Sequence, residues 1–265
     1  EFITSAVLWL LVTVTLGVLL VFNLRHAFLP EEHLVYLKLH AHAGFGGWFL
    51  LLIIGASSKL LPMFALAHNL NERKLHVSYW SLNTALLLFF VQVFLGLGQM
   101  GWYFIGFLFL LGIGAYFSFI IEIFKKRLRK KLDVAMKHSF ISYFLLLLAL
   151  AGGILLLIPI ELPGGLKMAI SMVYGLSILI GFAGCLVLGQ TFKTLPFVIW
   201  LKRFQPFIGK TKPPMPVDLY SHGLVKIQLA LFLLGFFLLI TGTLLKIEVL
   251  QVSGGAALLF AAVVY

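Results

Sequence analysis

The sequence has few charged residues for its length. Only 11% of its 265 residues are Asp, Glu, Lys or Arg, whereas 62% are hydrophobic, and the mean hydropathy is +1.08. A soluble domain of this composition would lack the polar surface that contacts water. The alternation of polar and apolar residues that marks the strands of a membrane barrel is also missing. The two absences exclude a soluble protein and a barrel and predict an all-α, polytopic transmembrane helix bundle.

Apolar runs recur along the chain and are long enough for transmembrane helices. A helix needs about 20 residues to cross the hydrocarbon core of a bilayer. The sequence offers eight such runs, the last one short, and we expect one transmembrane domain over 1–265 with no convincing internal repeat. Because the sequence begins at Glu1 and its last run reaches Tyr265, we also expect a chain cut at both ends. The predicted spans are 2–24, 34–58, 76–98, 102–124, 138–160, 166–190, 222–245 and 249–265.

Cysteine is almost absent. The one cysteine, Cys185, lies within a predicted span and has no partner for an internal disulfide. We expect it to be a small packing residue.

Acidic residues are scarce, with 9 Asp and Glu against 20 Lys and Arg, which gives a net charge of +11. The basic excess lies in alternate connections, above all in the run 125–131. By the positive-inside rule these connections are cytoplasmic, so the N-terminal end of the chain begins in the cytoplasm, and we expect a bacterial inner membrane. The run has no interleaved aromatic residues, so we expect it to contact anionic lipid and no nucleic acid. The cytoplasmic cations are Arg73, Lys74, Lys125, Lys126, Arg127, Arg129, Lys130, Lys131, Lys137, Lys193, Lys202, Arg203, Lys210 and Lys212; the opposite side has Arg25, Lys38, Lys167 and Lys246.

One cytoplasmic connection, 191–218, is long and contains several prolines. Aromatic and basic residues mix in its first half, which is typical of an amphipathic segment at a membrane surface. Its second half includes Pro213, Pro214 and Pro216, which stiffen a linker. We expect this connection to lie on the membrane or to bind a partner subunit.

Two histidines, His40 and His42, begin an otherwise apolar helix near the outer leaflet. An imidazole buried in lipid is costly unless something binds it. At 100° per residue, His40 shares a face with Gly44 and Gly47, whereas His42 points the opposite way. The two glycines predict a flat groove that suits either a planar macrocycle or a closely packed helix. A neutral imidazole in such a groove is a natural axial ligand of heme iron; alternatively, both histidines bond water at headgroup level and the glycines serve helix packing.

The pattern His-x-His-x-x-x-x-Gly-aromatic, at the outer start of a second helix, resembles the second helix of the heme-copper oxidase and nitric oxide reductase superfamily. It also resembles the His-Ala-His opening of NnrS-type membrane heme proteins. The step Leu61-Pro62 likewise resembles the way that helix ends in this group. The resemblance implies an oxidase-like fold of about 12 helices, with further helices beyond Tyr265, and a low-spin heme b bound by His40. It places the second axial ligand beyond Tyr265 and implies respiratory subunits, quinone or cytochrome c as partners.

The copper-site histidines of that superfamily are missing from this sequence. Neither the sixth span, 166–190, nor the outer end of the seventh, 239–246, contains a histidine. A copper centre of this type requires three imidazoles, so the resemblance implies no copper and makes oxygen or nitric oxide reduction at a binuclear site unexpected.

Three further histidines, His76, His138 and His222, stand at the cytoplasmic ends of predicted spans. Interfacial histidines usually bond loop carbonyls or reach water. A sharper hypothesis is that two of the three bind a second heme or metal ion. Two classes of function therefore stay open: a heme protein that transfers electrons or binds a gas such as nitric oxide or oxygen, and a heme-free carrier or scaffold subunit of a respiratory membrane complex.

Overall fold

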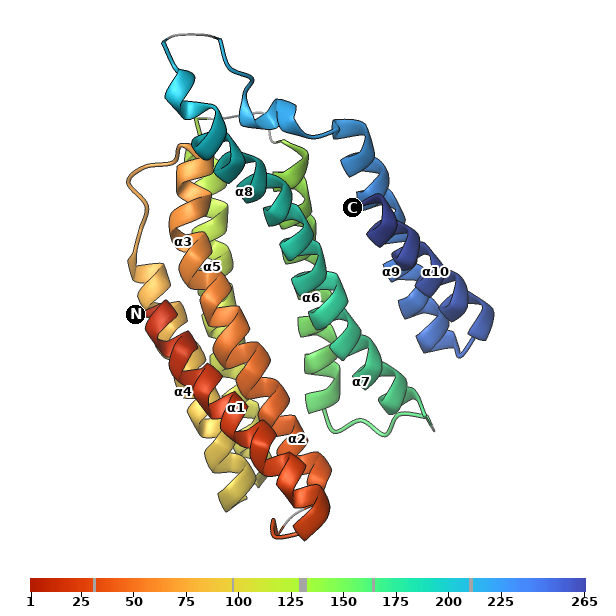
Figure 1. Ribbon diagram of the computed structural model, residues 1–265. Coiled ribbons are helices and arrows are strands. Elements are labelled where there is room, and N and C mark those ends of the chain that lie inside the picture. The colour runs from red at the N-terminus through yellow and green to blue at the C-terminus, as the bar shows by residue number, and fades with distance from the viewer. Residues whose placement is uncertain (31, 97, 129–132, 164, 210–211) are drawn as a thin grey trace. The chain divides into compact units, whose positions relative to one another are not determined.

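The computed structural model describes the chain except for residues 31, 97, 129–132, 164 and 210–211. Its described residues form helices and connections without any strand, which confirms the all-α prediction (Figure 1). Seven of the described helices are long and apolar enough to cross a membrane, and Glu248–Val264 is a shorter apolar helix, so the protein is a multi-pass membrane protein. Residues 129–131 of the predicted basic run, and Lys210, lie outside the described residues.

The chain divides into two compact units, Glu1–Lys130 and Lys131–Tyr265, where we expected a single domain. The first unit contains α1 (Phe2–His26), α2 (His33–His42), η1 (Ala43–Leu50), α3 (Leu51–Ala65), α4 (Arg73–Leu95) and α5 (Gly98–Lys126). The second contains α6 (Val134–Leu157), α7 (Leu166–Leu176), η2 (Ser177–Gly184), α8 (Cys185–Arg203), η3 (Gln205–Phe207), η4 (Pro216–Leu219), α9 (His222–Leu245) and α10 (Glu248–Val264).

The second long helix of each unit contains a π-helical segment. Helices α2, η1 and α3 form one continuous helix, His33–Ala65, and α7, η2 and α8 form another, Leu166–Arg203. In each, eight residues in the middle have π-helical hydrogen bonding. Segments of this kind are rare and usually short, and they are frequent at functional sites.

The two long helices share a sequence pattern, so the expectation that the chain has no internal repeat is wrong. Each contains a glycine followed by an aromatic residue, then a glycine, a lysine and a Leu-Pro step, with identical spacing. The first copy is Gly47-Trp48, Gly55, Lys59 and Leu61-Pro62; the second is Gly181-Phe182, Gly189, Lys193 and Leu195-Pro196. The pattern begins within the π segment of each helix and ends at a proline inside the following α-helix.

Each copy of the pattern packs in the same way against the first helix of its own unit. A Cβ atom added at any of these glycines would meet a side chain of the partner helix at 3.4 Å or less. Three pairs of contacts correspond: Gly17 with His40 and Gly153 with Tyr174; Gly47 with Trp9 and Gly181 with Leu145; Gly55 with Phe2 and Gly189 with His138. The repeat is therefore a packing unit, in which α1 lies against α2, η1 and α3 as α6 lies against α7, η2 and α8 (Figure 1).

Helix α8 continues beyond the membrane span predicted for it. We expected the chain to leave the helix near residue 190, but α8 ends at Arg203, so the first half of the predicted 191–218 connection is helical. The aromatic and basic residues there extend a helix that already exists and do not form a separate surface segment. Trp200 Nε1 donates a hydrogen bond of 2.6 Å to the Pro214 carbonyl, which ties the proline-containing part to α8.

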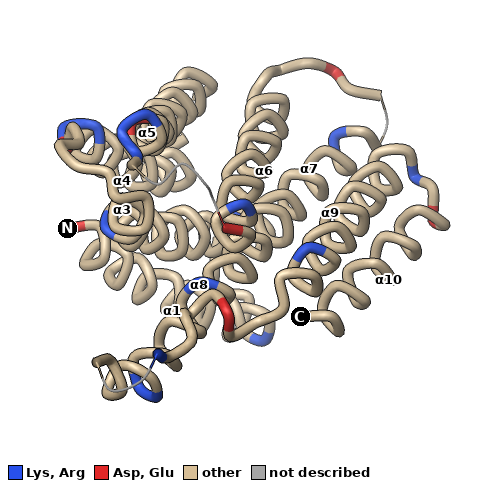
Figure 2. The backbone as a smooth tube through the Cα atoms, turned by 90° about the horizontal axis from the view of Figure 1, so that it is seen from above, with Lys and Arg blue, Asp and Glu red and all other residues tan. Residues whose placement is uncertain are grey.

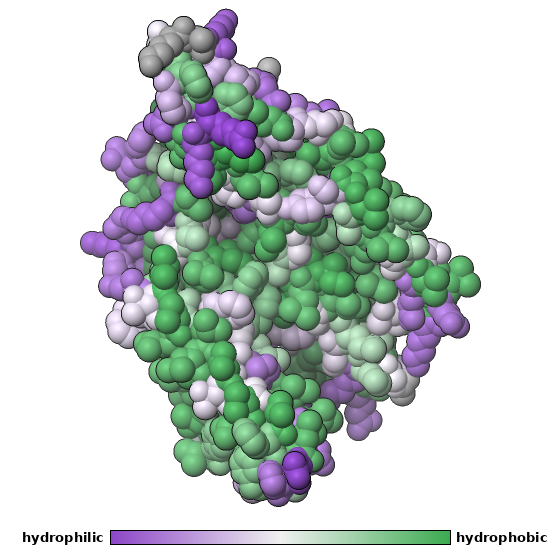
Figure 3. Space-filling view, viewed as in Figure 1, coloured by the Kyte–Doolittle hydropathy of each residue, from purple (hydrophilic) through white to green (hydrophobic). Residues whose placement is uncertain are grey.

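Apolar side chains cover the outward sides of the helices, as contact with lipid requires. Many are more than half exposed, among them Leu11, Phe104 and Leu179. Figure 3 shows hydrophobic residues over the helix sides and hydrophilic residues toward the helix ends, and Figure 2 shows most lysines and arginines at helix ends and in connections. The lipid bilayer is therefore the environment of the helices.

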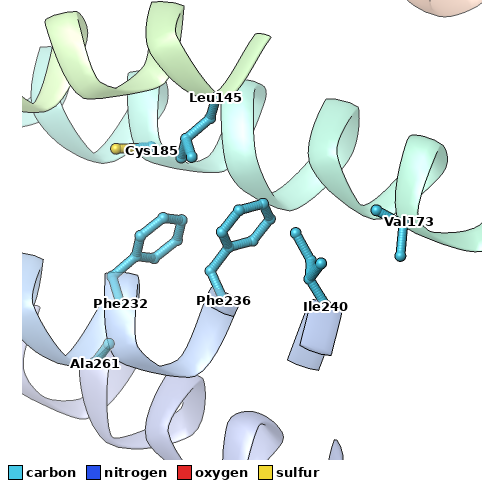
Figure 4. Close-up of a cluster of buried hydrophobic side chains, with 7 residues drawn as sticks. All are labelled: Leu145, Val173, Cys185, Phe232, Phe236, Ile240 and Ala261. Atoms are coloured by element: carbon cyan, nitrogen blue, oxygen red, sulfur yellow. The ribbon is translucent and has the colours of Figure 1, made fainter. Parts of the chain in front are cut away.

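The core of the second unit confirms the packing role expected for Cys185. Its thiol is fully buried in a cluster with Leu145, Phe232 and Phe236 (Figure 4). The Phe236 ring occupies the space beside Gly181, where an added Cβ would meet it at 2.7 Å.

Candidate functional site

The imidazole of His40 is held against helix α1. Its Nδ1 lies 3.0 Å from the Thr13 carbonyl oxygen, and because that oxygen only accepts, Nδ1 carries the proton. The ring lies over Gly17, where an added Cβ would stand 3.0 Å from Cε1. In the neutral ring this tautomer leaves a lone pair on Nε2. Ligating histidines usually have this arrangement, because the second ring nitrogen donates to a carbonyl and fixes the ring.

The two glycines predicted to share a face with His40 also face α1. A Cβ at Gly44 would meet Thr13 Cγ2 at 2.9 Å, and one at Gly47 would meet Trp9 Cγ at 2.5 Å. The prediction of a common face is confirmed. Of the two occupants that we considered for the groove, however, the structure places the packed helix against both glycines.

His42 points toward helix α4. Its ring centroid is 4.8 Å from that of Phe89, and its Nδ1 donates a hydrogen bond of 2.8 Å to the Lys38 carbonyl. Gly46 faces the same helix through Leu86. The prediction that the two histidines point in different directions is confirmed, and one planar ligand would not reach both.

The three histidines predicted at the cytoplasmic ends have separate partners. His138 is fully buried, and both of its nitrogens are occupied: Nδ1 donates to the Val134 carbonyl at 3.0 Å, and Nε2 lies 3.0 Å from Gln228 Oε1. His76 lies 3.8 Å from the Glu1 carboxylate, and the His222 ring contacts Tyr220. His138 therefore has no nitrogen available for a metal ion. Nowhere in the described part of the chain do three His, Cys, Asp or Glu side chains come close enough together to hold one.

A row of residues on α1 was missed by sequence reasoning. Trp9, Thr13 and Gly17 follow one another at four-residue intervals, so they lie on one face of the helix. Trp9 Nε1 donates to Asn83 Oδ1 at 3.0 Å, and Thr13 Oγ1 donates to the Trp9 carbonyl at 2.7 Å. The four-residue spacing of one aromatic, one small polar and one glycine residue was the available signal. It marks the face of α1 that receives His40.

Comparisons with known proteins identify no relative. No protein-family model, curated protein or solved structure matches the chain.

The residues around His40 fit a heme only in part. The ring is fixed, and its tautomer is the one an axial ligand needs. The side chains of Trp9 and Thr13 fill the space over Gly47 and Gly44, so these glycines contact protein and do not border a porphyrin in this packing.

Proposed function

We propose that the chain is a heme-binding integral membrane protein related to the catalytic subunits of heme-copper oxidases. In this proposal His40 is an axial ligand of a b-type heme. The observation that supports it is the hydrogen bond from His40 Nδ1 to the Thr13 carbonyl, which fixes the ring and reserves Nε2 for a ligand. A bound heme would supply one-electron transfer or binding of a gas such as nitric oxide or oxygen.

The residues of the chain hold and orient the imidazole in this proposal. Gly17 leaves room for the ring, and the Thr13 carbonyl of α1 accepts a hydrogen bond from its Nδ1–H. Trp9 fixes α1 to α4 through Asn83, which keeps the accepting carbonyl in place. The resemblance to the oxidases adds a respiratory role in a bacterial inner membrane, with the N-terminal end in the cytoplasm and with respiratory subunits, quinone or cytochrome c as partners.

A reduced-minus-oxidised spectrum of the purified protein tests the proposal. Sharp α and Soret bands are expected after reduction with dithionite. His40→Ala should remove the signal of one heme, whereas His42→Ala, the matched control on the same helix, should perturb it only slightly. Loss of the signal in His42→Ala but not in His40→Ala would show that His42, and not His40, is the heme ligand. A flat spectrum of the unaltered protein would contradict the proposal as a whole.

One observation favours a second candidate, a heme-free carrier. Carriers built from repeats bind substrate at corresponding positions of the two copies, and π-helical segments are frequent at functional sites. The two π-helical segments, Ala43–Leu50 and Ser177–Gly184, occupy corresponding positions in the two copies of the repeat. A flat spectrum together with substrate-dependent transport in proteoliposomes would support this function.

A further inference from the structure

A cavity of about 260 Å³ lies in the first unit beside the end of α3. The connection between α3 and α4 runs back along α3, and its residues line the cavity together with Phe119 of α5. Polar and apolar residues both line it, among them Lys59, His68 and Glu72 on one hand and Pro62, Leu75 and Phe119 on the other. Its position at the ends of two membrane-spanning helices is where lipid headgroups lie.

The connection that forms the cavity is held in place by α5. The carboxylate of Glu122 accepts hydrogen bonds from Lys74 Nζ at 2.7 Å, from Lys126 Nζ at 2.8 Å and from the Asn71 backbone N–H at 3.2 Å. Lys126 Nζ also donates to the Asn69 carbonyl. Because the connection is tied to α5 at Asn69 and Asn71, its backbone is ordered beside the cavity, and a ligand would spend little free energy on ordering that backbone.

Opposite charges stand at the cavity on exposed side chains. Lys59 Nζ is 4.0 Å from Glu72 Oε1, and the two side chains are 82% and 73% exposed. An exposed ion pair of this kind contributes little to stability. A ligand that carries one charge of each sign can therefore separate the pair and bind both partners.

The internal repeat shows that this lysine is accessible only in the first copy. Lys193 occupies the same position in the second copy, but it forms an ion pair with Asp133 and its side chain is only 15% exposed. Lys59 has no such buried carboxylate. The two copies thus place the same cation at the same helical position, and only the first leaves it available to a ligand.

A residue of α3 that lines the cavity has a backbone carbonyl without its usual helical donor. Pro62 lies inside α3 and has no N–H to donate to the carbonyl of Ser58, one turn earlier, which lines the cavity. This carbonyl and the Glu72 carboxylate are both acceptors, and a primary ammonium group has three donors.

We propose that this cavity binds the headgroup of an aminophospholipid, with the phosphate at Lys59 and the primary ammonium at Glu72 and the Ser58 carbonyl. Phosphate and ammonium in one headgroup match the pair of charges in the cavity, and the lipid tails would lie along the apolar residues of α3. The inference does not depend on heme binding, because none of these residues contacts His40.

Native mass spectrometry of the detergent-purified full chain tests the proposal. We expect phosphatidylethanolamine to bind about 3- to 10-fold more tightly than phosphatidylcholine, whose quaternary ammonium has no N–H to donate. Glu72→Gln should abolish this preference, and Lys59→Gln should weaken binding of both lipids. Glu161→Gln and Lys167→Gln make the same charge changes at exposed sites of the second unit and should change neither.

Three outcomes would overturn the proposal. Equal binding of the two lipids would remove the role of the primary amine. If Glu72→Gln still preferred phosphatidylethanolamine to phosphatidylcholine, the ammonium would have to bind at another place. Binding of soluble phosphoethanolamine as tightly as the lipid would show that the cavity takes a free metabolite and that the tails contribute nothing. A thermal unfolding curve for each variant identifies any loss of binding that results from misfolding.

Discussion

At the scale of single residues, glycine decides which groups reach His40. Glycines on both helices of the α1 interface allow the backbones to approach closely, a common device of membrane helices. Gly17 admits the imidazole, and Gly47 admits the Trp9 ring, whose Cγ would lie 2.5 Å from an added Cβ. The close approach of α1 that fixes His40 therefore also fills the helix face at Gly44 and Gly47, so no flat ligand can lie against these glycines.

Gly47→Ala should destabilise the protein through this contact. The Trp9 ring is large and bonded to Asn83, so it has little freedom to move away from a new methyl group. Overpacking of this kind costs about 1–3 kcal/mol. Thermal unfolding in detergent, followed by tryptophan fluorescence, measures the change.

Gly114→Ala is the matched control. Gly114 is also in a helix, α5, but nothing lies within 4 Å of an added Cβ. Alanine should be neutral there or stabilise the helix by up to about 1 kcal/mol. Equal effects of the two substitutions would mean that the α1 interface is looser than the structure indicates.

At the scale of elements, hydropathy alone predicted most of the helices but not their local form. The predicted span 222–245 coincides with α9, and the other spans differ from the helices mainly at their ends, since the apolar runs reflect the thickness of the bilayer. The π segments could not be predicted, because hydropathy does not distinguish π from α hydrogen bonding. The repeat was missed because Gly47, Gly55, Lys59 and Pro62 match their counterparts within segments that otherwise share only apolar character.

The candidate site around His40, like the helices, could be predicted from the sequence only in part. A period of 3.6 residues placed His40 and Gly47 on one face, and the structure confirms this. The period does not reveal which helix covers that face, because the partner depends on long-range packing. Thr13 contacts His40 through its backbone carbonyl, so the pattern of side chains in the sequence could not predict this contact.

Helix α6 provides a test at this scale, because Asp133 both caps it and pairs with Lys193. One carboxylate oxygen accepts from the Met136 N–H at 2.9 Å, and the other binds the ammonium. Asp133→Asn should keep the cap but lose the pair, at a cost of about 3 kcal/mol, because the charge of Lys193 is mostly buried. Asp133→Ala should lose both and cost about 1 kcal/mol more. Chemical denaturation in detergent measures the two values.

A second readout reports the charge at Asp133 separately from stability. Burial, and to a smaller extent the Asp133 carboxylate, raise the pKa of the Tyr220 phenol above its usual value. Asp133→Asn removes the smaller cause, so the pKa of Tyr220 should fall, as measured by tyrosinate absorbance against a Tyr220→Phe reference. In the denaturation experiment, an equal loss of unfolding free energy in Asp133→Asn and Asp133→Ala would mean that the helix cap contributes nothing to the stability of α6.

At the scale of the whole molecule, the number of long helices in the first unit predicts how the chain crosses the membrane. If the four long helices of the first unit, His33–Ala65 among them, each cross once, the chain returns to the side where it began. Helix α6 would then start on the side of the membrane where the chain began. The basic residues at the end of α5 and the acidic Glu161 after α6 would lie on opposite sides.

Labelling of introduced cysteines tests this topology in the intact protein. The natural thiol, Cys185, is fully buried, so a membrane-impermeant maleimide should not react with it, and the unaltered chain serves as the blank. Lys125→Cys and Glu161→Cys are both exposed and flank α6. In spheroplasts we expect Glu161→Cys to be labelled at once and Lys125→Cys only after permeabilisation, because the positive-inside rule places the basic end of α5 in the cytoplasm. The reverse pattern would invert the orientation and place His40 near the inner leaflet, whereas labelling of both sites before permeabilisation would mean that α6 does not cross the bilayer.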